Sequence, residues 1–519
     1  MKIAVKTAIL FLAIVVLSSS NGISLLQARQ SSLISRVIEE LQREIPKWIE
    51  AQDIPGAAVA VVDDKNVLWE YVYGSTRREG GRRIDPETLF SIQSMSKSFT
   101  ALGVLMAVQD GLLNLDTPIL EYLPEFKVNS PHEESPERKM TLRHLLAHRA
   151  GFTHEAPLGG NYDDRPHAFD EHILSISDTW LRYPVGSRYS YSNLGIDLAG
   201  YILQEQAGMP FWDYIRIKVL EPLGMDQSTL DVDKIKETAN RAIGHVASRH
   251  EIEGGIPVFI PVIPAGGVYT NIRDMAKYLQ FHINKGTVEG RQLLRGALVE
   301  EMHSVAFSEK QQQTGYGLGI SRHTTDKTYY LQHGGGGYGF ITSMCMYPEL
   351  KIGVVTLTNS EGSKISSASI VNIINSFVES QTGKIESMPA VPSKDIMQPL
   401  DETDERTARM LGVFEAGIHS DRYYGTYRSC DFQKPEKSQN SEGPDKPEWK
   451  KYIGRYQMLV WGRWPASMLW VTKVKGNLAV NGSRCTEYLP GLFFTQTGEA
   501  LDFRGTIPTF RNILLYKKK

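Results

Sequence analysis

The chain has 519 residues, with 57 basic and 59 acidic side chains and a formal net charge of −2. A length of this order predicts two or three domains of roughly 150 residues each. The near balance of charge excludes a nucleic-acid-binding protein with a broadly basic surface, and it excludes a long acidic tail. Apolar residues make up 41% of the chain, which excludes a disordered or fibrous protein and predicts a large buried core.

The first residues have the pattern of a secretory signal peptide. Lys2 and Lys6 precede the apolar run Thr7–Leu17, and small polar residues follow as far as Gly22. The apolar run is too short to cross a bilayer, which takes roughly 20 residues. We therefore expect a signal peptide over residues 1–22, a secreted or periplasmic protein, and no stable membrane span.

Strands and helices follow in an order that places strands at both ends of residues 33–383. A helix is expected over Leu33–Glu50, followed by a β-hairpin and then by the apolar helix Phe99–Val108, which Gly111 ends. From Leu115 to about Leu230 the pattern is mostly helical. The strands expected on either side of this region are Ala57–Val62, Val67–Tyr73, Tyr329–His333, Phe340–Tyr347 and Ile352–Thr358, and a helix over Ser363–Gln381 closes the segment.

This order predicts an α+β domain whose antiparallel sheet is assembled from both ends of the segment, is flanked by helices, and has a helical region inserted between its strands. Residues 384–449 are rich in Pro, Ser, Glu and Lys over Met388–Asp404 and Lys434–Lys450, which is typical of a linker region. Residues 450–519 carry short strands between Gly and Asn turns and predict a small antiparallel β-barrel or sandwich. Those strands are Met468–Lys475, Leu478–Val480, Leu492–Thr495, Leu501–Phe503 and Asn512–Tyr516.

Ser94 and Lys97 form the strongest chemical signal in the chain. They lie three residues apart just before an apolar helix, so both side chains are expected on one helical face, one turn apart. A serine hydroxyl becomes a good nucleophile only when a neighbouring base takes its proton, and a lysine in a buried site can be that base. Alone, the pattern also fits a serine helix cap beside a solvated lysine.

Other motifs follow Ser-x-x-Lys in a fixed order. Tyr191-Ser-Asn193 lies at a predicted junction between a loop and a helix, and the run from His333 to Phe340 joins two predicted strands. Two further segments, Thr141–Gly151 and Pro264–Asp274, lie between these motifs.

Together these segments resemble the serine β-lactamase-like family, which includes class C β-lactamases, D-alanyl-D-alanine carboxypeptidases, related esterases and D-amino-acid peptidases. The resemblance covers about Ile45 to Phe377. The chain after Glu448 resembles the lipocalin-like C-terminal domain of some members.

The resemblance implies a role for each matching residue. Ser94 is implied to be the acyl-forming nucleophile, Lys97 its base, and Tyr191 a group that shares proton transfer with the lysine. Asn193 is implied to orient the substrate. His333, Gly335 and Gly336 occupy the third substrate-binding motif, and the backbone N–H groups of Ser94 and Gly336 are implied to form the oxyanion hole.

The sequence departs from the common family pattern at three places. Gln93 stands where glycine is common, and Arg149-Ala150 replace the usual small hydroxyl pair before Gly151. His333 stands where other members have lysine. A histidine is mostly neutral at pH 7, so it attracts a substrate carboxylate less than lysine does.

Competing patterns are weaker. Gly334-x-Gly336-x-x-Gly339 matches a dinucleotide fingerprint but is followed by a predicted strand instead of the required helix. His333 and the glycines after it imitate an α/β-hydrolase oxyanion loop, but the chain has no G-x-S-x-G elbow. His144 and His148 are four apart, as metal ligands can be, but no third ligand is evident and a structural role is favoured for His148. The three cysteines, Cys345, Cys430 and Cys485, form no C-x-x-C pair, so neither a zinc site nor a disulfide framework is predicted.

We therefore expect a secreted serine hydrolase that acts on amide or ester bonds through an acyl-serine intermediate, with a small-molecule or peptide substrate and no cofactor or metal. Two alternatives remain open at this point: a class C-like β-lactamase, and a non-catalytic penicillin-binding or sensing protein.

Overall fold

The computed structural model describes residues 30–161, 163, 165–245, 263–307, 314–380, 446–460, 464–474 and 476–518. The expected signal peptide lies outside these ranges, and so does most of the expected linker region. Among the helices in the described ranges, none is both long enough and apolar enough to cross a membrane.

A seven-stranded antiparallel sheet forms the centre of the first part of the chain, in the order β2-β1-β11-β10-β9-β8-β7. The first strand, β1, pairs with the last, β11, so that Ala57 faces Thr358 and Val62 faces Gly353. This pairing confirms that the sheet is assembled from both ends of the segment. The strands are β1 (Gly56–Val62), β2 (Val67–Gly74), β7 (Gly315–Tyr316), β8 (Ser321–Thr324), β9 (Tyr329–Gly337), β10 (Phe340–Tyr347) and β11 (Ile352–Thr358).

Alternate residues of the central strands face two separate apolar cores, because side chains of a strand alternate between the two faces of a sheet. Ala57 and Val59 pack under the N-terminal helix (residues 30–52) and α11 (Ser367–Ser380). Ala58 and Ala60 belong to the larger core on the other face, beneath α9 (Ile272–Ile283) and α2 (Ser96–Gln109). All seven residues of β1 are buried, as expected for a strand covered on both faces.

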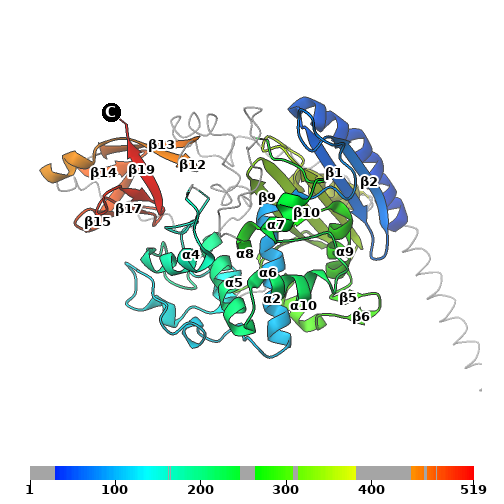
Figure 1. The fold of residues 1–519 in the computed structure, drawn as a ribbon, viewed down its shortest axis with the longest axis horizontal. Helices are drawn as coiled ribbons and strands as arrows, with labels where there is room; N and C mark the ends of the chain where they lie inside the picture. The colour runs from blue at the N-terminus through cyan, green and yellow to red at the C-terminus, as the bar shows by residue number, and fades with distance from the viewer. Residues whose placement is uncertain are drawn as a thin grey trace, which may run out of the picture.

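The helix α2 lies at the centre of the larger core (Figure 1), and every residue from Ser96 to Ala107 is buried. It contacts α5, α6, α8 and α10, so a side chain at its N-terminus is held by most of the helical region. The other helices are α3 (Leu142–Leu146), α4 (Phe169–Ser175), α5 (Asn193–Ala207), α6 (Phe211–Ile215), α7 (Val232–Glu237), α8 (Ile263–Gly266) and α10 (Gly296–His303). Two small two-stranded sheets pair β3 (Phe90–Ser91) with β4 (Tyr269–Thr270) and β5 (Thr287–Val288) with β6 (Arg291–Gln292).

The C-terminal strands form a closed antiparallel barrel, drawn in orange to red in Figure 1. This confirms the expected small antiparallel β-barrel and excludes the sandwich. Three strands, β12, β15 and β18, were not expected from the sequence: exposed residues interrupt the apolar pattern of β12 and β15, and β18 has only two residues. The strands are β12 (Gly454–Val460), β13 (Trp464–Val474), β14 (Asn477–Val480), β15 (Ser483–Leu489), β16 (Leu492–Thr495), β17 (Ala500–Asp502), β18 (Thr509–Phe510) and β19 (Ile513–Lys517).

A buried glutamate of the barrel joins it to the helical region. Glu499 is 2% exposed, and its Oε1 lies 2.8 Å from Arg182 Nε. Its Oε2 accepts a hydrogen bond of 2.9 Å from the hydroxyl of Thr153. Asn512 of the barrel donates through Nδ2 to the backbone carbonyl of Glu155, at 2.9 Å. The barrel therefore contacts the loop that begins at Thr153.

Candidate active site

Ser94 lies in a tight turn, η1 (Gln93–Met95), between β3 and α2. Gln93 has a φ of +50°, a left-handed conformation that is uncommon for a residue with a side chain. The amide of Gln93 donates a hydrogen bond of 2.7 Å to Ser91 Oγ, which holds the turn in place. Gln93 and Met95 are buried, whereas Ser94 is half-buried. The turn thus presents the Ser94 hydroxyl at the N-terminus of a rigid helix.

Lys97 is fully buried in the first turn of α2. Its Nζ donates to Ser94 Oγ at 3.0 Å and to the carbonyl of Ala265 at 2.9 Å. Burial lowers the pKa of Lys97 to about 7, and the negative charges of Asp197 and Glu155 oppose this shift. A lysine with this pKa is partly neutral at neutral pH, so it can accept the proton of Ser94.

The Tyr-x-Asn motif lies where the sequence predicted it, at the start of α5. Ser192 caps this helix by accepting a hydrogen bond from the backbone of Gly195, which places Tyr191 and Asn193 on either side of the cap. Lys97 Nζ lies 4.9 Å from the centre of the Tyr191 ring. Asn193 Nδ2 donates to Glu155 Oε1 at 3.0 Å, and this hydrogen bond fixes the orientation of the Asn193 amide.

An aromatic wall connects Tyr191 to His333. The centre of the His148 ring lies 4.4 Å from the centre of the Tyr191 ring and 4.7 Å from that of the Tyr316 ring. The hydroxyl of Tyr316 is 2.8 Å from His333 Nε2. Burial, helped by the positive charge of Lys97, lowers the pKa of His333 to about 3, so the ring is neutral at physiological pH. A neutral imidazole carries one proton. If that proton is on Nδ1, His333 donates it to the carbonyl of Gly334, 2.7 Å away, and Nε2 accepts from the hydroxyl of Tyr316.

The glycines after His333 continue strand β9 as far as Gly337 and bring it against the Ser94 turn. A Cβ atom at Gly335 would lie 2.0 Å from the carbonyl oxygen of Ile92 and 2.5 Å from Thr342 Oγ1. Only glycine fits at this distance. The next residue, Gly336, is half-buried on the same strand. The chain after Gly337 turns into β10, which rules out the helix that a dinucleotide fingerprint requires.

The structure therefore brings Ser94 and Tyr191 to the buried amine of Lys97. Asn193 follows Tyr191 at the start of α5 and contacts Glu155, and His333 and Gly335 lie on strand β9. The possible metal pair separates, because α3 ends at Leu146 and His148 has a φ of +56° outside the helix. His148 Nδ1 instead accepts a hydrogen bond of 3.2 Å from the backbone of Ser192. Within the described ranges, no group of three metal-binding side chains is present.

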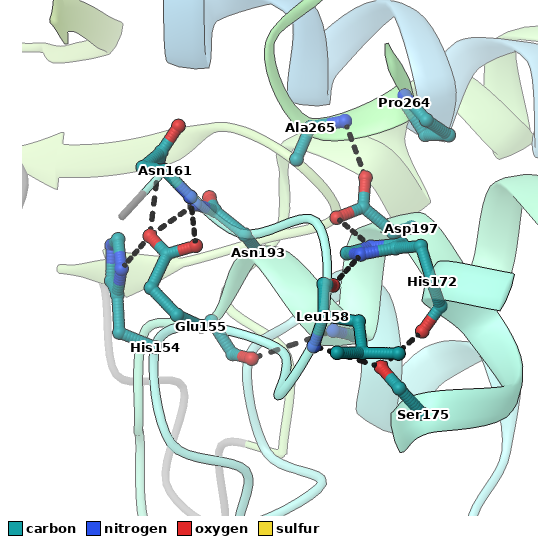
Figure 2. Close-up of polar contacts among 12 residues, drawn as sticks. His154, Glu155, Leu158, Asn161, His172, Ser175, Asn193, Asp197, Pro264 and Ala265 are labelled. Carbon is teal, nitrogen blue, oxygen red and sulfur yellow. Dashed lines mark hydrogen bonds and ion pairs between the residues drawn. The ribbon is translucent and has the colours of Figure 1, made fainter. Parts of the chain in front are cut away.

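Sequence analysis missed three buried polar residues behind the site: Glu155, His172 and Asp197 (Figure 2). Glu155 accepts hydrogen bonds from Asn161 and Asn193, and it contacts His154. Asp197 did carry a signal, because it is an acidic residue in an apolar helical run, four residues after Asn193 and therefore on the same face of α5.

A family model described as Beta-lactamase matches residues 34–370. The chain belongs to the Beta-lactamase family. Among curated proteins, Protein flp of Staphylococcus aureus (strain N315) is 24% identical over 335 residues, which are 63% of this chain and 64% of flp. Unguisins hydrolase ungD' of Aspergillus campestris is 27% identical over 336 residues, which are 62% of this chain and 61% of that protein. The chain thus matches less than two thirds of the length of these relatives.

Two solved structures share the fold. An octameric penicillin-binding protein homologue from Pyrococcus abyssi aligns with a TM-score of 0.56 at 21% identity, covering 92% of this chain and 99% of its own. The D-alanine carboxypeptidase AmpC from Burkholderia cenocepacia aligns with a TM-score of 0.54 at 20% identity, covering 67% of this chain and 99% of its own. At these identities the likeness establishes the fold of the β-lactamase-like part.

Proposed function

We propose that this chain is a serine hydrolase that cleaves amide or ester bonds through an acyl-Ser94 intermediate. The observation that carries the proposal is the contact of 3.0 Å between Ser94 Oγ and the amine of Lys97, whose pKa burial lowers to about 7, so that it is partly neutral at neutral pH. A purely structural role does not require this arrangement, because burying a lysine amine costs free energy that an exposed lysine avoids.

The geometry supports a two-step reaction. Neutral Lys97 takes the proton of Ser94 as Oγ attacks the substrate carbonyl, and the backbone N–H groups of Ser94 and Gly336 stabilise the oxyanion. The C–O or C–N bond then breaks, and the leaving group receives a proton through Tyr191 and Lys97. Water, deprotonated by the same groups, attacks the acyl-enzyme, and release of the acid restores the Ser94 hydroxyl.

His333 favours a peptidase or esterase over a β-lactamase. Its burial keeps it neutral, so it offers no positive charge to the carboxylate that a lysine in this motif would attract. The names of two similar proteins, a hydrolase of unguisins and a D-alanine carboxypeptidase, are compatible with acyl transfer but leave the substrate of this chain to experiment.

Serine-reactive labelling tests the proposal. We expect a fluorophosphonate to label the wild-type chain at Ser94, and Ser94→Ala to lose labelling and turnover while keeping the wild-type circular dichroism spectrum. Ser177→Ala is the matched control, because Ser177 is half-buried like Ser94 and far from the motif in sequence. Retention of more than a small fraction of turnover in folded Ser94→Ala would show that Ser94 is not the nucleophile.

A substrate panel separates the remaining functions. It contains a nitrophenyl ester, a D-Ala-D-Ala peptide, a D-aminoacyl amide and a chromogenic cephalosporin. Multiple turnovers on the ester or an amide support the proposal. Turnover of the cephalosporin alone indicates a β-lactamase, and stable acylation without turnover indicates a penicillin-binding or sensing protein. The further proposal of secretion rests on the residues 1–22 and is tested by sequencing the N-terminus of the exported chain.

A further inference from the structure

A chain of buried polar contacts leads from Lys97 away from Ser94, into the interior, and Figure 2 shows its part from Ala265 to His172. Lys97 donates to the carbonyl of Ala265, at 2.9 Å. The backbone N–H of Ala265 donates to Asp197 Oδ1, at 3.0 Å. The other oxygen, Oδ2, lies 3.3 Å from His172 Nε2, and His172 Nδ1 lies 2.8 Å from the carbonyl of Leu158. The short helix α8 therefore joins the catalytic lysine to an acid–imidazole pair.

The partners of His172 define its protonation. A carbonyl oxygen and an ionised carboxylate only accept hydrogen bonds, so when Asp197 is ionised both ring nitrogens donate and the ring is an imidazolium. Burial raises the pKa of Asp197, while the hydrogen bond and positive charge of His172, the charge of Lys97 and the N–H of Ala265 favour its ionised form. Burial opposes a charged ring, but the hydrogen bond to Asp197 and its negative charge raise the pKa of His172 above its usual value. Asp197 is 0% exposed and His172 is 1% exposed, so water does not screen the pair.

Several charged or titratable groups surround Lys97. Ser94 lies on η1, Tyr191 and Asp197 come from α5, Glu155 from the loop before α4, and His148 and His333 from the aromatic wall. Burial lowers the pKa values of both histidines, which leaves them neutral. Asp197 and Glu155 are thus the two negative charges that act on the lysine, and Glu155 already orients Asn193.

We propose that Asp197, held by His172, is a positioning residue that anchors the Ala265 turn under Lys97 and sets the pH at which Lys97 becomes the general base. This inference rests on the proposed acyl-serine function. It assigns a catalytic consequence to a pair that does not touch the substrate.

The negative charge of Asp197 can be removed without removing its hydrogen bonds to Ala265 and His172. In Asp197→Asn, the amide oxygen still accepts from the N–H of Ala265, and the amide nitrogen can donate to a neutral His172. Asp197→Asn loses the negative charge of the carboxylate together with the positive charge of His172. Only the carboxylate acts on Lys97 appreciably, so the variant loses an interaction that favours protonated Lys97. The pKa of Lys97 therefore falls, and the acidic limb of the pH–rate profile moves to lower pH by roughly one unit. At pH 6 we therefore expect wild type to run at about one-tenth of its plateau rate and the variant at about one-half of its own plateau rate, a difference of roughly five-fold.

The experiment measures, between pH 5 and 9, the second-order rate at which a fluorophosphonate phosphonylates Ser94 of the full chain and releases fluoride, in wild type and Asp197→Asn. Asp170→Asn is the matched control, because Asp170 is exposed on α4, the helix that carries His172. We expect the midpoint to move in Asp197→Asn only. An unchanged midpoint in folded Asp197→Asn overturns the proposal, because a merely structural role lowers the rate without moving the midpoint.

Nitrogen NMR of the wild-type chain provides a second measurement that does not depend on turnover. We expect His172 to remain an imidazolium at pH 7, and a neutral ring would overturn the inference. The lysine signal that is lost in Lys97→Met reports the pKa of Lys97 directly. If wild type is not labelled at all, the proposed function fails, whereas labelling with an unmoved midpoint defeats only the role of Asp197.

Discussion

Substitution of Tyr191 tests whether it shares proton transfer with Lys97. It stands beside Lys97, whose amine lies 4.9 Å from the ring centre, and it precedes the cap of α5. Tyr191→Phe keeps the ring and removes the hydroxyl, so we expect the chemical step to slow by roughly 10²–10⁴-fold, the usual loss for a general acid–base group. Single-turnover acylation and deacylation rates measure this. Tyr201→Phe, within α5, is the control and should leave both rates unchanged. A loss of less than ten-fold in Tyr191→Phe would show that Tyr191 does not transfer the proton.

We propose that His333 sets the charge that the third motif offers to a substrate. The ring is neutral because burial lowers its pKa to about 3. His333→Lys introduces an amine at this position, so we expect the ratio of kcat/KM for a carboxylated substrate to that for a neutral ester to rise. His333→Gln is the neutral control and should leave the ratio near its wild-type value. A ratio that stays constant in an active His333→Lys enzyme would mean that His333 does not face the substrate.

The sequence predicted these residues because each belongs to a local motif that a short stretch of chain defines. Ser94 and Lys97 are one turn apart, and Tyr191 and Asn193 flank a capping serine, so local geometry alone brings each pair to one end of a helix. Asp197 and His172 are different, because their partnership depends on the packing of α4 and α8 against α5. No spacing along the chain shows such a contact.

The glycines of β9 allow this strand to lie against the Ser94 turn. Sequence analysis ended the strand at His333, because glycine weakens the pattern of a strand, yet pairing with β10 continues as far as Gly337. Close approach to the Ser94 turn requires this composition. The contacts of β9 with Ile92 and Thr342 are tertiary, so only the structure reveals why the glycines occur there.

Gly335→Ala tests that close approach. The new Cβ would lie 2.0 Å from the carbonyl oxygen of Ile92, which is backbone and cannot rotate away. Either β9 or the turn must shift, so we expect a loss of about 1–3 kcal/mol in the free energy of unfolding and slower acylation of Ser94. Thermal unfolding and fluorophosphonate labelling measure the two effects.

Gly334→Ala is the matched control for this substitution. Its Cβ would meet its nearest atom, the carbonyl oxygen of Thr342, at an ordinary contact distance of 3.8 Å. We expect it to change acylation far less than Gly335→Ala. Equal effects of the two substitutions would show that the loss comes from glycine replacement in the strand and not from contact with the turn.

The two folded parts of the molecule meet through a buried charge. Glu499 of the barrel contacts Arg182 and Thr153, while Asn512 contacts the backbone of Glu155, the residue that holds Asn193. Aromatic contacts extend the interface, since Trp180 packs against Tyr488 and Phe494. Sequence analysis separated the domains by composition but had no means to detect this interface.

We propose that residues 33–383 and 450–519 are separate folding units, and that the barrel supports the site without supplying a reacting group. A chain that ends at Lys384 should therefore fold and be acylated at Ser94. It should also unfold at a lower temperature than the full chain, because Arg182 loses the carboxylate that balances it. Labelling with a fluorophosphonate and calorimetry measure these outcomes. Complete loss of labelling by a folded, truncated chain would contradict the proposal.

Glu499→Gln in the full chain removes the carboxylate charge that Glu499 shares between Arg182, 2.8 Å away, and Arg511 of the barrel, 3.3 Å away. Breaking one partner of a buried pair leaves the other charge unbalanced, so we expect a loss of roughly 3–5 kcal/mol in stability. Exposed Glu448→Gln, which lies in the same C-terminal part, is the control and should change stability little. A Glu499→Gln melting curve identical to wild type would mean that the interface does not depend on this charge.

The pairing of β1 with β11 also affects the order of events on the ribosome. Roughly 300 residues separate the two strands, so at about 5–20 residues per second β1 waits on the order of 15–60 s for its partner to be synthesised. During that time β1 and β2 form a hairpin whose inner edge, Gly56–Val62, is apolar and unpaired. The helical region between them contributes the hydrophobic residues of α2 before the sheet can cover them. The nascent chain therefore exposes an aggregation-prone edge until translation passes Thr358, and slowing translation upstream of that codon should lower the yield of native protein.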